Sequence, residues 1–228
     1  MSSVESRGPQ AAPRRRVDKR RAILDAAFTV FARRGYAQAC VQEVAEEAGV
    51  AKPTVYNHLS DKETLFRCAV EASADVLLAE LLTAVEHLRH RAGDQDPRAA
   101  LTDLAVELAR ICCSERAGAL RRLTYAEASH FTDLADTVQE RTARRPLAAL
   151  ADRLARLSLS GQLRPCDPEQ AAGHFFALLT GPLELQSRRG TRAVPDAELR
   201  ATAEAAVDVF LRAYAYEDER RASGGAER

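Results

Sequence analysis

The chain has 228 residues, of which 46% are hydrophobic and 29% are charged, and its formal net charge is zero. This length can bury a sizeable core in one or two domains. No apolar run approaches the roughly 20 residues that a membrane span requires. No apolar stretch follows the N-terminal arginines either, so neither membrane contact nor a secretory signal is expected.

Cysteine usage and charge distribution indicate a cytoplasmic protein with one basic end. Five cysteines without a C-x-x-C pair favour reduced thiols, and a redox role for the adjacent Cys112 and Cys113 is the less favoured interpretation. Residues 1–70 hold 12 Lys+Arg and 8 Asp+Glu, a charge of +4, whereas residues 71–228 carry −4. A basic end on an acidic body is typical of a protein that presents one end to nucleic acid.

Residues 1–16 are rich in Ser, Gly, Pro and Arg and contain little apolar surface, which predicts a disordered basic arm. Its last cations, Arg14 to Arg16, either form a solvated tail or contact phosphates and the minor groove beside a reading helix. Contact with nucleic acid is the favoured interpretation because of the motif that follows.

A first helix is expected from Val17 to Arg34, with its apolar residues on one broad face. Gly35 ends this helix, because glycine enters the left-handed conformation without a Cβ penalty. Tyr36 is expected to fill the core and not to contact DNA.

The stretch from Val41 to Leu59 predicts two short helices joined by a tight turn. Apolar residues recur in its first part at three- and four-residue spacing and therefore share one face. A small residue, a turn glycine and an aliphatic residue, at Ala45, Gly49 and Val55, form the packing pattern of a helix-turn-helix. The alternative for this spacing is an ordinary helical hairpin in a core.

The second of these helices carries an outward strip of hydrogen-bonding side chains without negative charge. Val55 and Leu59 lie four residues apart and face inward, and proline suits the first turn of the helix. Such a strip suits a major groove, where phosphates position a helix and base edges are read. The predicted DNA-binding residues of this helix are Lys52, Pro53, Thr54, Tyr56, Asn57 and His58.

Residues 17–67 resemble the DNA-binding domain of TetR-family transcriptional repressors. The family's run of Gly-aromatic, apolar helix, Gly-Val, Lys-x-Thr-aliphatic-Tyr-x-His and Lys-Glu-x-Leu-Phe is present almost in full. It stands here as Gly35-Tyr36, Val41 to Ala48, Gly49-Val50, Lys52 to His58 and Lys62 to Phe66. The rest of the chain resembles the family only in its helical character and its length.

The resemblance implies an all-α fold, in which an N-terminal three-helix helix-turn-helix domain is joined by a long helix to a C-terminal helical bundle that binds a ligand and dimerises. The domains would cover residues 17–65 and 66–216, followed by a disordered tail at 217–228. The resemblance also makes Lys62 a contact to the DNA backbone. Cys40 stands where the family usually has a hydroxyl residue, and it would cap a helix or donate to a phosphate only weakly.

The S-x-x-E pattern of Ser60 and Glu63 predicts a capping box, followed by a long helix from about Asp61 to His90. Apolar stripes bury this helix on much of its circumference, and one rod would connect the reading end to the second domain. The spacing of His87 and His90 could bind a metal ion, but two surface histidines are the favoured interpretation. No metal and no cofactor is expected.

Three further helices are expected at 97–113, 115–129 and 131–158, and Pro146 must break or kink the third. Tyr125 is placed on the inner side of its helix. The resemblance implies a small effector bound among these helices. Four residues could line its pocket, although core packing explains each equally well, so no ligand residue is assigned: Tyr125, His130, Phe131 and Phe176.

The last two helices, at 168–187 and from Pro195 onward, are apolar around most of their circumference. This excess of apolar surface predicts a subunit interface, and in the family the last two helices pair with their copies. The predicted interface residues are Phe175, Leu179, Leu183, Val207, Phe210 and Leu211.

Together these features predict a homodimeric repressor that binds a two-fold operator on double-stranded DNA. The resemblance further implies that a small apolar or amphipathic effector releases it. An architectural DNA-binding protein would need more cations and no large apolar bundle. An enzyme is the least favoured alternative, since no nucleophile elbow, P-loop, H-E-x-x-H or dinucleotide fingerprint is present.

Overall fold

The computed structural model describes the backbone of residues 11–91, 96–188 and 190–216, and their side chains except for residues 11–18 and 89–91. Within these ranges all regular structure is helical, and the one extended pairing is an isolated bridge between Leu163 and Ala215. The all-α prediction is therefore confirmed. The chain divides into two compact units, residues 1–73 and 74–228, and each is described by itself.

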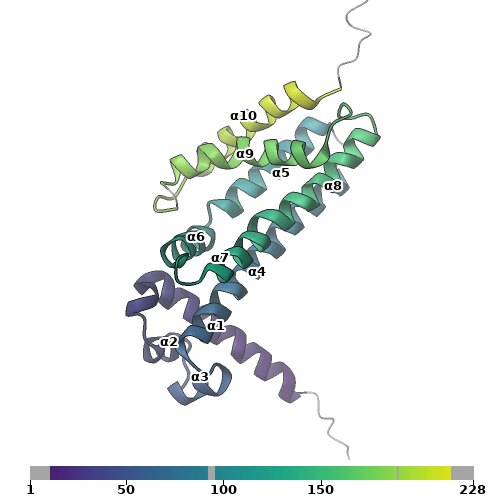
Figure 1. Ribbon diagram of the computed structural model, residues 1–228. Helices are drawn as coiled ribbons and strands as arrows, with labels where there is room; N and C mark the ends of the chain where they lie inside the picture. The colour runs from purple at the N-terminus through teal and green to yellow at the C-terminus, as the bar shows by residue number, and fades with distance from the viewer. Residues whose placement is uncertain (1–10, 92–95, 189, 217–228) are drawn as a thin grey trace, which may run out of the picture. The chain divides into compact units, whose positions relative to one another are not determined.

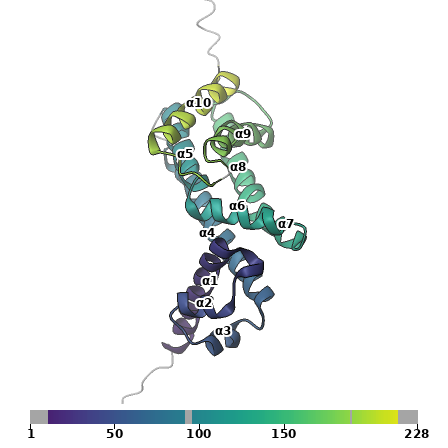
Figure 2. The same ribbon diagram turned by 90° about the vertical axis from the view of Figure 1, so that its left-hand side faces the viewer.

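The first unit contains α1 (Ala11–Gln38), α2 (Val41–Glu47), α3 (Lys52–His58) and the beginning of α4 (Lys62–Arg91) (Figure 2). The helix α1 begins before the predicted Val17, so residues 11–16 of the predicted disordered arm are helical, and the rest of that arm lies outside the described residues. Gly35 interrupts α1 as predicted, with φ of 75°. The core of this unit consists mainly of buried apolar side chains of α1, α2 and α4.

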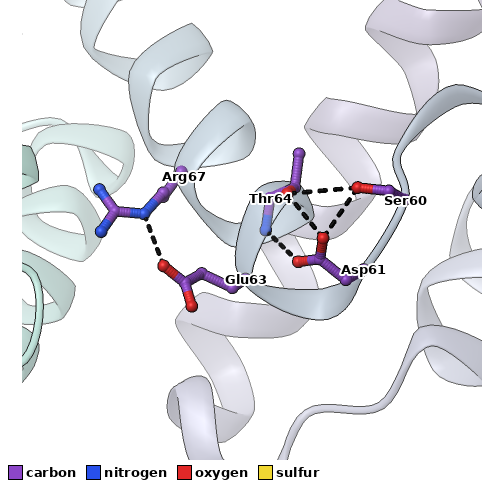
Figure 3. Close-up of polar contacts among 5 residues, drawn as sticks. All are labelled: Ser60, Asp61, Glu63, Thr64 and Arg67. Carbon is purple, nitrogen blue, oxygen red and sulfur yellow. Dashed lines mark hydrogen bonds and ion pairs between the residues drawn. The ribbon is translucent and has the colours of Figure 1, made fainter.

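The N-terminus of α4 is capped differently from the predicted box of Ser60 and Glu63. Asp61 accepts a hydrogen bond from the amide of Thr64 at 2.7 Å, and Glu63 instead pairs with Arg67 at 3.0 Å (Figure 3). The Thr64 amide and the hydroxyls of Ser60 and Thr64 together hold the pKa of Asp61 below its usual value. Asp61 is thus the N-cap of α4, and Ser60 supports it with a hydrogen bond of 2.8 Å.

The second unit is a helical bundle formed by the C-terminal part of α4 and the helices that follow. They are α5 (Pro97–Cys112), α6 (Glu115–Glu127), α7 (Thr132–Gln139), the π-helical turn η1 (Glu140–Arg144), α8 (Arg145–Leu159), α9 (Pro168–Gln186) and α10 (Asp196–Tyr214) (Figure 1). Within it α10 packs on α5 and α9, and α9 also packs on α8. The predicted tail at 217–228 lies outside the described residues.

The predicted break at Pro146 takes the form of the π-helical turn η1, which separates α7 from α8. The amide of Arg145 bonds to the carbonyl of Glu140, five residues earlier, as a π-helix requires. A proline cannot donate an amide hydrogen bond and its ring clashes with the carbonyl four residues before it, so the wider turn accommodates Pro146 at the start of α8.

The six side chains predicted to form the subunit interface are buried within a single chain. They pack in the core of the second unit, where the rings of Phe175 and Phe210 meet edge to face with centroids 5.2 Å apart. Each of the six is at most 8% exposed in the protomer, which leaves little surface for a second copy. Their burial does not support the assignment of these six residues to a subunit interface: Phe175, Leu179, Leu183, Val207, Phe210 and Leu211.

Candidate nucleic-acid interface

The turn between α2 and α3 is closed by two backbone hydrogen bonds. The amide of Gly49 bonds to the carbonyl of Glu46 at 3.1 Å, and that of Val50 reaches the carbonyl of Ala45 at 2.9 Å. This pair of bonds is a Schellman cap, and it places Gly49 in the left-handed region with φ of 63°. The turn glycine predicted from the sequence therefore sets the angle at which α3 leaves α2.

The substitution Gly49→Ala is expected to lower the free energy of unfolding by about 1–2 kcal/mol, the usual cost of a left-handed backbone for a residue with a Cβ. No atom lies within 4 Å of the position that the new Cβ would occupy, so the cost is one of backbone conformation alone. Thermal unfolding followed by circular dichroism measures it. Gly49→Asn is the matched control and should cost less, because asparagine tolerates this conformation. An equal loss of unfolding free energy in the two variants would contradict the left-handed conformation of Gly49.

The helix α3 directs its apolar side inward and its polar strip outward, as predicted. Val55 and Leu59 are 1% and 4% exposed, whereas 45% of Tyr56 is exposed. Of the other predicted DNA-binding residues of α3, Lys52, Pro53 and Asn57 are exposed. Thr54 and His58 are half-buried. The strip is therefore free to meet a groove, and the individual contacts remain predictions.

Two ion pairs hold α2 against the end of α1. Arg34 contacts Glu43 at 3.1 Å, and Arg33 contacts Glu47 at 3.6 Å. Glu43 also accepts a hydrogen bond from the amide of Cys40 at 3.4 Å. Burial opposes the ionisation of Glu43, but the Cys40 amide and Arg34 outweigh it and keep the pKa of Glu43 below its usual value. A carboxylate thus takes part of the capping role that the exposed Cys40 thiol fills poorly.

Lys62 links the start of α4 to the end of α1, a contact that local sequence patterns do not reveal. Its ammonium donates to the carbonyl of Ala37 at 3.0 Å and lies 4.9 Å from the centre of the Tyr36 ring. Tyr36 is half-buried, and its ring packs in turn against those of Phe31 and Phe66. An ammonium has three N–H donors, so two remain for a phosphate.

The N-terminal part of α1 carries exposed basic side chains. Lys19, Arg20 and Arg21 are exposed, and Arg20 lies 3.7 Å from the sulfur of Cys68. The side chains of Arg14 to Arg16 lie outside the described residues. The first unit thus carries exposed cations on α1 that could contact phosphates.

Two family models match the chain. Residues 23–69 match the N-terminal domain of bacterial regulatory proteins of the tetR family, and residues 99–216 match the C-terminal domain of AefR-like transcriptional repressors. The chain belongs to the TetR family. It is accordingly a DNA-binding transcriptional regulator, and members of this family are not enzymes.

One solved structure and two curated regulators are among the proteins similar to this chain. The crystal structure of a TetR-family regulator from Mesorhizobium loti is 32% identical, covers 88% of this chain and 98% of its own, and superposes with a TM-score of 0.80. YfiR from Bacillus subtilis is 41% identical over 71 residues, and the activator FasR from Mycolicibacterium smegmatis is 37% identical over 70. These two matches span 31% of this chain and about a third (35% and 32%) of those relatives.

Two other candidate sites raised by the sequence lie in the second unit. Burial raises the pKa of Cys112 to about 11 and also raises that of Cys113, which makes both thiols poor nucleophiles and disfavours a redox role. His87 lies 3.4 Å from Glu107, and the side chain of His90 is outside the described residues. No helix in the described part of the chain has the length and apolar character needed to cross a bilayer.

Proposed function

We propose that this TetR-family protein is a homodimeric repressor that binds a two-fold operator and releases it when a small apolar or amphipathic effector binds the second unit. The observation that carries the proposal is the outward polar strip on α3, braced from behind by Val55 and Leu59. Each subunit would insert residues 52–59 in a major groove, with half-sites about 34–36 Å apart, which is one helical turn of DNA, or a multiple of that distance.

The roles of the strip follow from its chemistry. Tyr56, His58 and Lys62 would contact phosphates. Lys52 and Cys40 would lie beside the same stretch of the DNA backbone. Thr54, Pro53 and Asn57 would face base edges or thymine methyl groups. The operator is sought by selecting bound DNA from a random pool. A short palindrome supports the repressor, whereas diffuse coverage would favour an architectural protein and no enrichment would exclude specific DNA binding.

The substitution Lys62→Ala is expected to weaken binding to all DNA sequences and to reduce the slope of log affinity against log salt by about one unit per subunit contact. Fluorescence anisotropy with the operator and with a scrambled duplex, each at several salt concentrations, measures both effects. Lys62→Arg is the control, because it keeps a cation near Ala37 and Tyr36. A loss confined to the operator would contradict the phosphate role.

Small apolar side chains on the outer faces of α9 and α10 support a dimer. On α10 they recur every fourth residue, and all five are exposed: Ala197, Ala201, Ala205, Val209 and Ala213. Ala177 and Gly181 on α9 are exposed at the same spacing, and Leu185 follows them with 82% exposure. Rows of small residues allow helices of two copies to approach closely and pack ridge into groove. The proposed interface therefore uses the same helices as predicted, but their opposite faces.

A pocket of about 690 Å³ in the second unit supports the effector part of the proposal. The turn η1 contributes to its lining, and Arg141 of that turn pairs with Asp75 of α4 at 3.2 Å. A ligand that shifts η1 would therefore also shift α4, whose N-terminal end belongs to the first unit. Release of DNA requires that the effector bind the DNA-incompetent conformation more tightly than the competent one.

A further inference from the structure

The pocket of the second unit has apolar walls and a small polar region. Its walls come from α4 to α9 and include Leu77, Leu81, Leu120, Val138, Leu147 and Phe176. The polar region includes Arg121 of α6 and Glu184 of α9. A pocket of about 300–1,000 Å³ with mostly apolar walls and a few placed polar groups is the usual site for a small organic ligand.

Arg121 is the described residue of the pocket lining that has a buried donor without a hydrogen-bond partner. Its Nη2 donates to the carbonyl of Cys112 at 3.0 Å, while its Nη1 lies 3.9 Å from a carboxylate oxygen of Glu184. Its Nε is buried, and in the described part of the chain it has no acceptor. An arginine stays charged, so the guanidinium as a whole is poorly compensated. A ligand in the pocket cannot reach the buried Nε, but it can offer an acceptor to Nη1, whose ion pair with Glu184 is long.

The surroundings of Arg121 do not supply a full counter-charge. Burial raises the pKa of both Cys112 and Cys113, so these neighbouring thiols are neutral near pH 7. Among the described residues that line the pocket, Glu184 carries the one carboxylate, and it is half exposed at the long distance given above. The second arginine of the lining, Arg144, pairs with Glu140 at 3.7 Å and is largely exposed.

We propose that the pocket binds an amphipathic carboxylic acid, with the carboxylate on Arg121 and the hydrocarbon or aromatic body between the apolar walls. Hydrogen bonds between charged groups are about twice as strong as neutral ones, and a guanidinium offers two parallel donors to a carboxylate. This inference rests on the proposed effector role, and it names the chemical class that the second unit of this protein selects.

Two fluorescent probes with the same apolar body test the proposal: 11-(dansylamino)undecanoic acid and its carboxamide. The full-length protein is titrated with each probe in the absence of DNA. The acid should bind at least about tenfold more tightly than the amide, because a hydrogen bond to a charged group usually contributes that much to the affinity. Arg121→Met should remove this preference by weakening the acid alone, and Arg121→Lys should retain part of it.

Arg156→Met is the matched control, because it removes an exposed arginine of the second unit that does not line the pocket and should leave the preference unchanged. Circular dichroism verifies that each variant folds. Equal binding of acid and amide, absence of binding by both, or a preference that survives in Arg121→Met would overturn the proposal. A separate gel shift tests whether the acid releases operator DNA, as the proposed function requires. If the acid binds with the stated preference but the DNA stays bound, the ligand class is supported and the release mechanism is contradicted.

Discussion

The Tyr56→Ala variant is expected to lose operator binding while its dimer and its helicity survive. Tyr56 lies in the middle of α3 between the inward Val55 and the outward Asn57, and 45% of its surface is exposed. Its removal therefore leaves no cavity in the core. A lost phosphate hydrogen bond and lost ring packing cost about 1–3 kcal/mol, and a dimer loses them twice, so affinity should fall by about a hundredfold or more. Fluorescence anisotropy with labelled operator measures this loss.

Two controls separate the contact from a general effect of removing tyrosine. Tyr56→Phe keeps the ring and should lose only the part of the affinity due to the hydroxyl. Tyr125→Ala removes another exposed tyrosine, at 70% exposure in the second unit, and should bind operator normally when no effector is present. Unchanged affinity of Tyr56→Ala would count against the proposed docking of α3.

The helix-turn-helix could be predicted closely because its signals are local. Gly49 ends α2 through a bond pattern that spans six residues, and Pro53 lies at the start of α3, so the bounds of both helices follow from neighbouring residues. The alternation of Val55 and Leu59 with polar residues likewise settles which side of α3 faces inward. Such features depend little on the rest of the chain.

Features that depend on distant residues could not be predicted in the same way. Ser60 and Asp61 are both good helix caps, and the sequence alone does not decide between them, whereas in the structure Asp61 accepts the bond from the Thr64 amide. The bond from Lys62 to Ala37 joins residues 25 positions apart. Tyr125 was placed inside its helix, yet most of its ring is exposed and it lines the rim of a pocket.

The proposed interface illustrates why composition alone could not separate two apolar faces of one helix. Both α9 and α10 have one face of large residues and another of small ones, and either could cover the protomer's own core. Burial of large side chains such as Phe175 and Phe210 removes more apolar area from water than burial of small ones. The large side chains therefore pack in the protomer core. The small residues remain outside, where only the three-dimensional packing identifies them.

The substitution Ala205→Arg is expected to convert the protein to monomers. Ala205 lies at the centre of the exposed row of small residues on α10, and arginine is nearly as good a helix former as alanine, so the protomer should keep its fold. In a two-fold interface one substitution introduces two cations that face each other without a counter-charge, at a cost of several kcal/mol. Light scattering coupled to size-exclusion chromatography reports the mass.

Loss of the dimer should also reduce operator affinity by about a hundredfold or more, because linked binding of two half-sites gains this much from effective concentration. Ala79→Arg is the matched control, since Ala79 is an exposed alanine within α4 of the second unit, and it should remain dimeric and bind operator. A dimer that persists in Ala205→Arg at micromolar concentration would place the interface elsewhere. A monomer that still binds one operator as tightly as the parent protein would instead contradict the two-fold docking, since each α3 would then act alone.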